Sequence, residues 1–168
     1  AGRLDIKTMV FGSPKNRLID NITPEQVLSV ASDFFSKISE TCYEHGVILC
    51  LEPNAKGYGC NFINNTEEAL KLINEVNHSN FQLNMDTSTL IMNSENLKGS
   101  ILKAKDNIAH FHISAPNLTP VSSDIIDFQL TSDLLKKIKY EGAVSIEMRP
   151  TTIPNIKKAL ELLENHFR

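Results

Sequence analysis

Long apolar runs, blocks of basic residues and cysteine pairs are missing from this sequence of 168 residues. No stretch approaches the roughly 18 consecutive apolar residues of a transmembrane helix, so we expect no membrane partner. The net charge is −3 and no basic block stands out, which argues against nucleic acid as a partner. The segment AGRLDIK has no apolar centre of the kind found in signal peptides, and we therefore expect a cytoplasmic protein.

The three cysteines, Cys42, Cys50 and Cys60, are an odd number and show no Cys-x-x-Cys spacing. This usage is typical of a reduced compartment and argues against a structural zinc site built from cysteines. We expect the three thiols to be small buried apolar groups or bystanders in a loop.

No linker, low-complexity tract or charge run divides the chain. Hydrophobic residues make up 41% of the sequence, which is enough for one domain with a real core. We therefore predict that residues 1–168 form a single domain.

Five short apolar runs, each followed by a helical pattern, predict alternating strands and helices. The predicted strands are Lys7–Phe11, Val47–Leu51, Phe81–Met85, Ile108–Ile113 and Ala143–Met148. Helices are expected from Pro24 to Gly46, from Thr66, from about Ser94 to Ala104, from about Phe128 to Tyr140, and over a last segment that carries Ile156 and Phe167. This alternation, with short connections, predicts a mostly parallel sheet.

One face of four predicted strands is polar, although buried parallel strands are usually apolar on both faces. The polar face carries, in strand order, Cys50 and Glu52; Gln82, Asn84 and Asp86; His110, His112 and Ser114; Ser145, Glu147 and Arg149. Burying a polar group without a partner costs about 1–3 kcal/mol. These side chains must therefore converge on one another, on water or on an ion.

Four of these polar residues stand at the carboxyl ends of their strands, where α/β barrels keep their chemistry. They are Glu52, Asp86, His112 and Glu147. Three carboxylates brought together repel one another, and a divalent cation between them relieves the repulsion. The alternative is four independent residues that face solvent. His110 shares the inward face with His112, and we expect it to support that residue or to be a hydrogen-bonded core histidine.

At these residues the sequence resembles the xylose-isomerase-like TIM barrels, on the segments GSPKNR, LEPN, NMDTSTL, HFHIS and SIEMRP. That group includes sugar-phosphate isomerases and epimerases, ketose 3-epimerases, hydroxypyruvate isomerase and the endonuclease IV group. The resemblance implies an α/β fold of five consecutive βα units, the C-terminal portion of a (β/α)8 barrel with strands four to eight. It also implies one divalent metal ion, Mn²⁺ first and Mg²⁺, Co²⁺ or Zn²⁺ as alternatives, held by Glu52, Asp86, His112 and Glu147.

The activity implied by the resemblance is metal-dependent isomerisation or epimerisation of a small sugar or sugar phosphate through an enediolate. Glu52 and Glu147 are then the catalytic residues, one removing a proton and the other returning it. The alternatives are a non-catalytic barrel fragment or sugar-binding remnant and, third, an endonuclease IV-like metal-dependent hydrolase.

Three positions depart from the ketose 3-epimerases, which carry Glu, His and Arg where this chain has Tyr58, Thr89 and Leu118. These departures count against ketose 3-epimerase activity proper. The candidate substrate-binding residues are Arg149, Lys15 and Arg17 as anchors for a phosphate or carboxylate, and Asn54 and Tyr58 as pocket lining. For Lys15 and Arg17 the alternative is solvated surface charge.

A closed barrel needs eight strands, and this sequence predicts five. An open parallel sheet exposes two edges that are apolar here. We therefore expect the chain to form a homo-oligomer or to pair with the missing N-terminal segment of a barrel.

Overall fold

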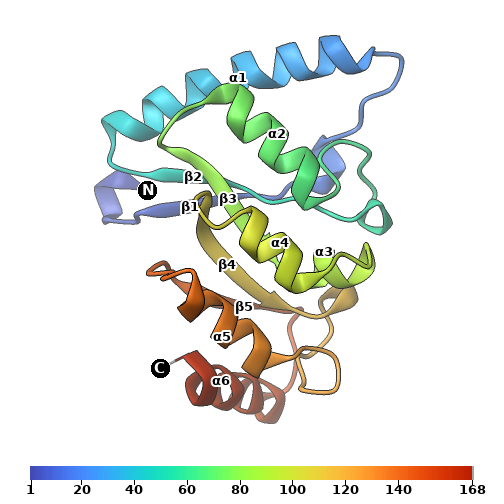
Figure 1. Cartoon of the computed structure of the whole chain (residues 1–168), viewed down its shortest axis with the longest axis vertical. Coiled ribbons are helices and arrows are strands. Elements are labelled where there is room, and N and C mark those ends of the chain that lie inside the picture. The colour runs from blue at the N-terminus through green and yellow to red at the C-terminus, as the bar shows by residue number, and fades with distance from the viewer. Residues whose placement is uncertain (168) are drawn as a thin grey trace.

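The computed structural model describes residues 1–167, and its centre is a sheet of five parallel strands (Figure 1). The strands are β1 (Thr8–Phe11), β2 (Ile48–Leu51), β3 (Phe81–Asp86), β4 (Ile108–Ser114) and β5 (Val144–Glu147). They lie side by side in chain order, each parallel to the next. The sheet curls into half of a barrel, so the predicted partial TIM-barrel fold of five βα units is confirmed.

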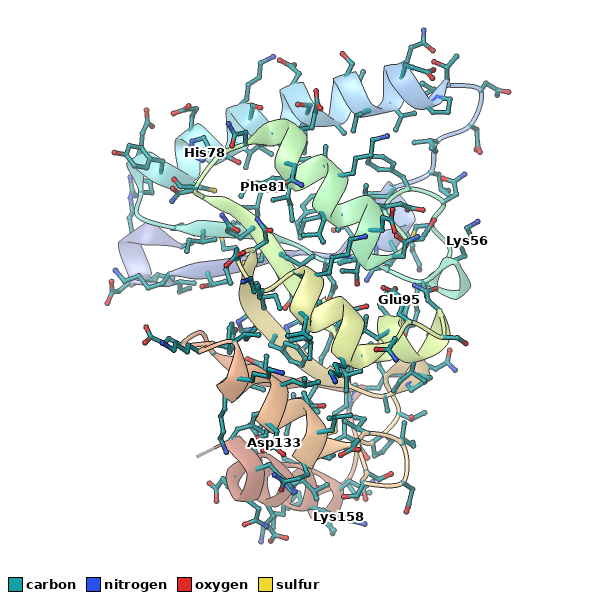
Figure 2. All side chains as sticks on the ribbon, viewed as in Figure 1. Lys56, His78, Phe81, Glu95, Asp133 and Lys158 are labelled. Carbon is teal, nitrogen blue, oxygen red and sulfur yellow. The ribbon has the colours of Figure 1, made fainter. Side chains whose placement is uncertain are left out.

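The helices alternate with the strands and pack their apolar sides on one face of the sheet (Figure 1). They are α1 (Pro24–Glu44), α2 (Thr66–Val76), α3 (Thr87–Met92), α4 (Leu97–Lys103), α5 (Phe128–Lys137) and α6 (Ile153–Phe167). The core between them includes Phe81 of β3, which is fully buried and stacks on Phe35 of α1 at 4.6 Å between ring centroids (Figure 2). Most charged side chains, such as Asp133 and Lys158, point away from this core (Figure 2).

Helix α1 begins at the residues that the sequence indicated. The Thr23 side chain accepts a hydrogen bond from the backbone N–H of Gln26, and the Gln26 side chain accepts one from the backbone N–H of Thr23. This reciprocal capping box satisfies two N–H groups that have no partner inside the helix, and Pro24 occupies the first helical position.

Helix α3 was not predicted, and α4 begins at Leu97 rather than at Ser94. The sequence of α3, TSTLIM, is rich in β-branched residues with low helix propensity. The helix starts because the Asp86 carboxylate accepts a hydrogen bond of 2.8 Å from the N–H of Thr89. A residue predicted as a metal ligand therefore also caps a helix.

The two faces of the sheet separate as the strand patterns predicted. Leu83 pairs with Ile108, whereas the next residue, Asn84, pairs with His110, so Ala109 is an extra residue in β4. Because a shift of one residue exchanges the faces of a strand, this bulge lets Ile108 join the outer face beside Leu83, while His110 stays on the inner face with His112. The outer face stays apolar and joins the core through Leu49, Leu51, Phe81, Leu83, Met85, Phe111 and Ile113.

The cysteines are free and buried, as expected for small apolar groups. Among residues 1–167, no helix combines the length and the apolar character needed to cross a membrane.

The edge at β1 is exposed and apolar. Strand β1 pairs with β2 on one side, and Phe11 packs edge-on against Phe34 and Phe35 of α1. Exposed large apolar residues gather on β1, α1 and the segments around them: Leu4, Ile6, Met9, Val10, Leu18, Ile22, Val30 and Phe34. At the other edge, every residue of β5 is half buried. The oligomer or N-terminal segment expected to cover these edges stays a prediction.

Candidate metal centre

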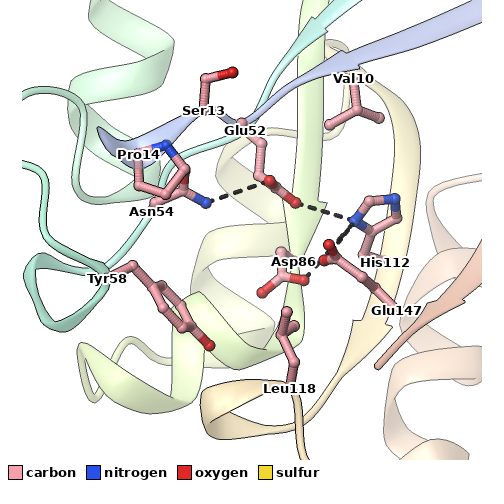
Figure 3. Close-up of a pocket in the computed structure, with 11 residues that line it drawn as sticks. Val10, Ser13, Pro14, Glu52, Asn54, Tyr58, Asp86, His112, Leu118 and Glu147 are labelled. Carbon is pink, nitrogen blue, oxygen red and sulfur yellow. Dashed lines mark hydrogen bonds and ion pairs between the residues drawn. The ribbon is translucent and has the colours of Figure 1, made fainter. Parts of the chain in front are cut away.

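The strand register brings the four predicted ligands to one point at the carboxyl end of the sheet. Asp86 lies opposite His112, and Glu147 lies opposite Ser114, two residues further along β4. The pairing of Leu51 with Leu83 places Glu52 beside Asn84. As a result, one ligand atom from each of the four residues lies within 4.8 Å of the other three (Figure 3).

The imidazole of His112 is at the centre of this cluster. Its Nδ1 atom lies 3.0 Å from Glu52 Oε1, 3.3 Å from Glu147 Oε2 and 4.0 Å from Asp86 Oδ2 (Figure 3). Burial alone lowers the pKa of His112, but hydrogen bonds with Glu147 and Glu52 outweigh it and raise the pKa to about 10. The protonated imidazole thus supplies positive charge next to the carboxylates of Glu52, Asp86 and Glu147.

Glu52 is buried and held on both carboxylate oxygens by amide side chains. Asn84 Nδ2 donates to Oε1 at 2.8 Å, and Asn54 Nδ2 donates to Oε2 at 3.3 Å. Gly12 passes so close that a Cβ atom there would lie 2.5 Å from Glu52 Oε2. The absence of a side chain at Gly12 therefore makes room for this carboxylate.

Asp86 is fixed by two donors from neighbouring segments. The N–H of Thr89 donates to Oδ1 at 2.8 Å, and the Ser114 hydroxyl donates to Oδ2. Burial raises the pKa of Asp86 to about 6, with the charge of Glu52 adding to the effect and the two hydrogen bonds opposing it. Both the raised pKa of Asp86 and that of His112 indicate a shortage of positive charge.

The donor set fits a divalent cation. Three carboxylates and one imidazole nitrogen suit Mn²⁺ and admit Mg²⁺, Co²⁺ and Zn²⁺. Within residues 1–167, no lysine or arginine forms an ion pair with these carboxylates. A bound cation would replace the proton of His112 and supply the positive charge that three clustered carboxylates favour.

A cavity of about 360 Å³ opens beside the cluster. Its walls come from the loops that follow β1, β2 and β4 and from the ligands themselves. The lining residues are Val10, Gly12, Ser13, Pro14, Glu52, Asn54, Tyr58, Asp86, His112, Leu118 and Glu147 (Figure 3). The cavity is large enough for a small molecule next to the four ligands.

The sequence profile described as "Xylose isomerase-like TIM barrel" matches residues 1–166. The chain belongs to this family. The resemblance drawn from the ligand segments is therefore confirmed.

Relatives within and around the family include sugar epimerases. A D-psicose 3-epimerase of Enterocloster bolteae is 26% identical over 113 residues, which cover 66% of this chain and 36% of the relative. The crystal structure of a D-psicose 3-epimerase in the presence of D-fructose superposes with a TM-score of 0.84 at 17% identity, covering 99% of this chain and 66% of that one. The crystal structure of an AP endonuclease, family 2, from Brucella melitensis superposes with a TM-score of 0.83 at 19% identity. The match covers 97% of this chain and 62% of that one. The chain thus spans less than two thirds of the length of these relatives.

Two of the three positions that differ from the ketose 3-epimerase members of this family line the cavity. The Tyr58 hydroxyl lies 2.6 Å from the Ser88 hydroxyl and accepts a hydrogen bond of 3.0 Å from the N–H of Asn117. Leu118 lines the cavity and has a φ of 56°, a rare conformation for a bulky residue. Thr89 instead is buried, and its hydroxyl donates to the carbonyl of Pro53 at 3.0 Å.

None of the three predicted cationic anchors belongs to the lining of the cavity. Lys15 and Arg149 are exposed and lie outside its lining. Arg17 is only 5% exposed, so it is neither an open anchor nor solvated surface charge. Its guanidinium donates to the carbonyl oxygens of Phe62, Ile63 and Glu52 and to the Asn54 side chain. The alternation of strand residues could not show this, because Arg17 lies in a loop.

His110 contacts His112 through its ring and not through a hydrogen bond. The two rings meet edge to face at 5.0 Å between centroids, and the buried Nδ1 of His110 has no hydrogen-bond partner among the described residues. Burial and the neighbouring His112 lower the pKa of His110. No described residue gives His110 Nδ1 a hydrogen bond, and the expectation that His110 supports His112 stays a prediction.

Sequence reasoning did not assign a supporting role to three residues beside the candidate ligands. Asn84, Ser114 and Gly12 all contact a ligand carboxylate or leave room for it. Asn84 and Ser114 lie on the inward polar face, two residues from Asp86 and His112 respectively, so their positions were visible in the sequence. Their specific partners were not, because these depend on the register between strands.

Proposed function

We propose that this chain carries the metal-binding and proton-transferring site of a sugar epimerase or isomerase. The observation that carries the proposal is the convergence of Glu52, Asp86, His112 and Glu147 within 4.8 Å at the mouth of a half-barrel. The similarity to a D-psicose 3-epimerase supports the same chemistry.

The four residues would hold one divalent ion, with Mn²⁺ the first candidate and Mg²⁺, Co²⁺ or Zn²⁺ as alternatives. When bound, such an ion supplies positive charge that makes a C–H next to a carbonyl more acidic and stabilises the resulting enediolate. The hydrogen bonds to Glu52 and Asp86 orient these carboxylates in advance, which is the usual role of groups behind a metal ligand.

Glu52 and Glu147 are suited to move the proton. Glu52 follows β2 and Glu147 ends β5, so the two carboxylates approach the centre from strands separated by β3 and β4. Glu52 is buried, whereas the Glu147 side chain is 42% exposed. We assign one carboxylate to remove a proton from a carbon of the sugar. The other carboxylate returns a proton to the neighbouring carbon in an isomerisation, or to the opposite face of the same carbon in an epimerisation.

The cavity favours an uncharged sugar over a sugar phosphate. No lysine or arginine belongs to its lining among the described residues, and Lys15, Arg17 and Arg149 lie elsewhere. A phosphate group placed in this cavity would meet the three carboxylates and, within residues 1–167, no lysine or arginine of the lining that could pair with it.

Exchange of solvent deuterium into substrate tests the proposal. The protein is incubated in D₂O with Mn²⁺ and a panel of free ketoses and their phosphorylated counterparts, and exchange at the carbon next to the carbonyl is followed by NMR. The account predicts exchange into at least one free ketose, its loss with EDTA, and weaker or absent exchange into phosphates. Exchange that persists in EDTA would contradict it.

The alternative is a sugar-binding remnant without turnover. Saturable sugar binding in the presence of Mn²⁺, without exchange into any sugar, would support it. Cleavage of an oligonucleotide with an abasic site would instead revive the hydrolase alternative.

A further inference from the structure

The two carboxylate oxygens of Glu52 have different surroundings. Oε1 lies inside the ligand cluster, 2.8 Å from Asn84 Nδ2 and 3.0 Å from His112 Nδ1. Oε2 lies on the side of Gly12 and Asn54, which both line the cavity. One oxygen therefore faces the ligands, and the other faces the side on which a substrate would enter.

Asn54 is itself held in one orientation. Arg17 Nη2 donates to Asn54 Oδ1 and, at 3.0 Å, to the carbonyl oxygen of Glu52, while Arg17 Nη1 donates to the carbonyl of Ile63 at 3.2 Å. A guanidinium has only donors, so the atom of Asn54 that faces it must be the oxygen. The amide nitrogen is then the atom directed at Glu52 Oε2, and Arg17 and Asn54 are only 5% and 7% exposed.

Asn84 performs the corresponding task for the other oxygen. It is fully buried in the middle of β3, and its Nδ2 donates to Glu52 Oε1 and lies 3.1 Å from His112 Nδ1. Rotation of its amide would turn the carbonyl oxygen toward the carboxylate, which is repulsive. Asn84 thus fixes Oε1 next to the imidazole ligand.

We propose that Asn84 and Asn54 divide the work of the Glu52 carboxylate. Asn84 aligns Oε1 as the metal-binding oxygen, and Asn54, held by Arg17, aligns Oε2 as the oxygen that takes and returns the substrate proton. A carboxylate with both tasks needs one oxygen free of the metal, and the two amides determine which one. Arg17, Asn54 and Asn84 are positioning residues in this scheme, which rests on the proposed epimerase or isomerase function.

The experiment compares Asn84→Ala with Asn54→Ala in the intact chain by two readouts. Calorimetric titration of Mn²⁺ into metal-stripped protein measures affinity, and deuterium exchange into a responsive ketose gives kcat and KM. We expect Asn84→Ala to weaken Mn²⁺ binding by about 10- to 100-fold, as removal of groups behind a metal ligand does. We expect Asn54→Ala to keep the Mn²⁺ affinity within about threefold and to lower kcat by about 10- to 100-fold at unchanged KM, because a misplaced base loses rate and not binding.

Two conservative variants separate positioning from general damage. Asn54→Gln retains the amide and should recover part of kcat. Arg17→Lys keeps the positive charge but loses the planar guanidinium with its two terminal donor nitrogens, and it should behave like Asn54→Ala. Thermal unfolding checks that each variant folds, and Asn84→Ser replaces Asn84→Ala where the alanine variant does not.

Equal losses of Mn²⁺ affinity in the Asn54 and Asn84 variants would overturn the division of labour. A fall in kcat for Asn54→Ala that is accompanied by an equally large fall in Mn²⁺ affinity would also overturn it. If the unaltered protein exchanges no sugar, the proposed function fails, and the difference in Mn²⁺ affinity between the two variants still decides the inference.

Discussion

Gly12 is the residue whose small size matters most directly to the site. A Cβ atom at this position would lie 2.5 Å from Glu52 Oε2, closer than two such atoms can approach. We expect Gly12→Ala to displace the carboxylate, to destabilise the protein by about 1–3 kcal/mol as overpacking does, and to lower both Mn²⁺ affinity and deuterium exchange. Urea unfolding and calorimetry measure these changes. Gly99→Ala, on α4 and away from the cluster, is the control, and equal metal affinity of the two variants would contradict the steric argument.

The pKa of His112 predicts how the metal-free protein responds to pH. The folded pKa is about 10 and the ordinary value is 6.5, so the folded state holds a proton that the unfolded state releases. Its contribution to stability is complete below pH 6.5 and is lost as the pH rises toward 10. We therefore expect the free energy of unfolding of the metal-free protein to fall between pH 6.5 and pH 8.5, below the range where Cys50, with a pKa raised to about 12 by burial, titrates.

Denaturant unfolding at several pH values tests this prediction, with His112→Asn as the variant in which the slope should flatten. Mn²⁺ should stabilise the protein more at pH 8.5 than at pH 6.5, because the ion and the imidazole proton compete for the same place. Stability of the metal-free protein that stays level or increases over this range would count against the charged imidazole.

The convergence of the four candidate ligands could be predicted from the sequence because a strand places alternate residues on one face. Glu52, Asp86, His112 and Glu147 each follow an apolar run, so their direction and their edge of the sheet were fixed by local pattern. Arg17 could not be placed in this way, because a long side chain in a loop finds its partners only in the folded structure. Its acceptors lie on residues 35 to 46 positions away in the sequence.

At the scale of elements, the start of α1 shows how local sequence determines a boundary. The capping box of Thr23 and Gln26 supplies the first turn with hydrogen bonds. We expect Thr23→Ala to destabilise the protein by about 1 kcal/mol, the usual effect of losing an N-cap side chain, and to leave Mn²⁺ affinity unchanged. Urea unfolding beside Thr41→Ala, an exposed position in the same helix, checks this; an equal effect of both substitutions would show that the cap contributes nothing.

Helix α3 and the bulge in β4 show what local sequence could not reveal. The segment TSTLIM has strand-like propensity. It becomes helical because Asp86 caps it and because Thr87, its first residue, exchanges hydrogen bonds with Ser114 at the end of β4. The extra residue Ala109 is visible only in the register between β3 and β4. Both features depend on contacts between segments far apart in the sequence, which a local pattern does not contain.

At the scale of the whole molecule, β1 and α1 carry exposed apolar side chains whose burial against another surface would be favourable. Val30 is 68% exposed and Phe34 47% exposed on the outer side of α1, next to an edge strand with apolar residues. We expect the chain to self-associate at high concentration through this face, since exposed apolar patches of this kind drive association.

Sedimentation velocity over a range of concentrations measures this association. Val30→Lys should shift the protein toward monomer, whereas Leu130→Lys on α5, a position that is 41% exposed, should not. A protein that is monomeric at every concentration, or one affected equally by both substitutions, would contradict the assignment of this face.

The measurement that tests the central claim most directly is calorimetric titration of Mn²⁺ into metal-stripped protein, beside Glu147→Gln and the exposed control Glu141→Gln. The account predicts one site per chain in the unaltered protein and in the control, and a loss of about 10-fold or more in affinity for Glu147→Gln. Absence of Mn²⁺ binding, or binding that Glu147→Gln leaves unchanged, would contradict the claim that the four strand-end residues form one metal centre.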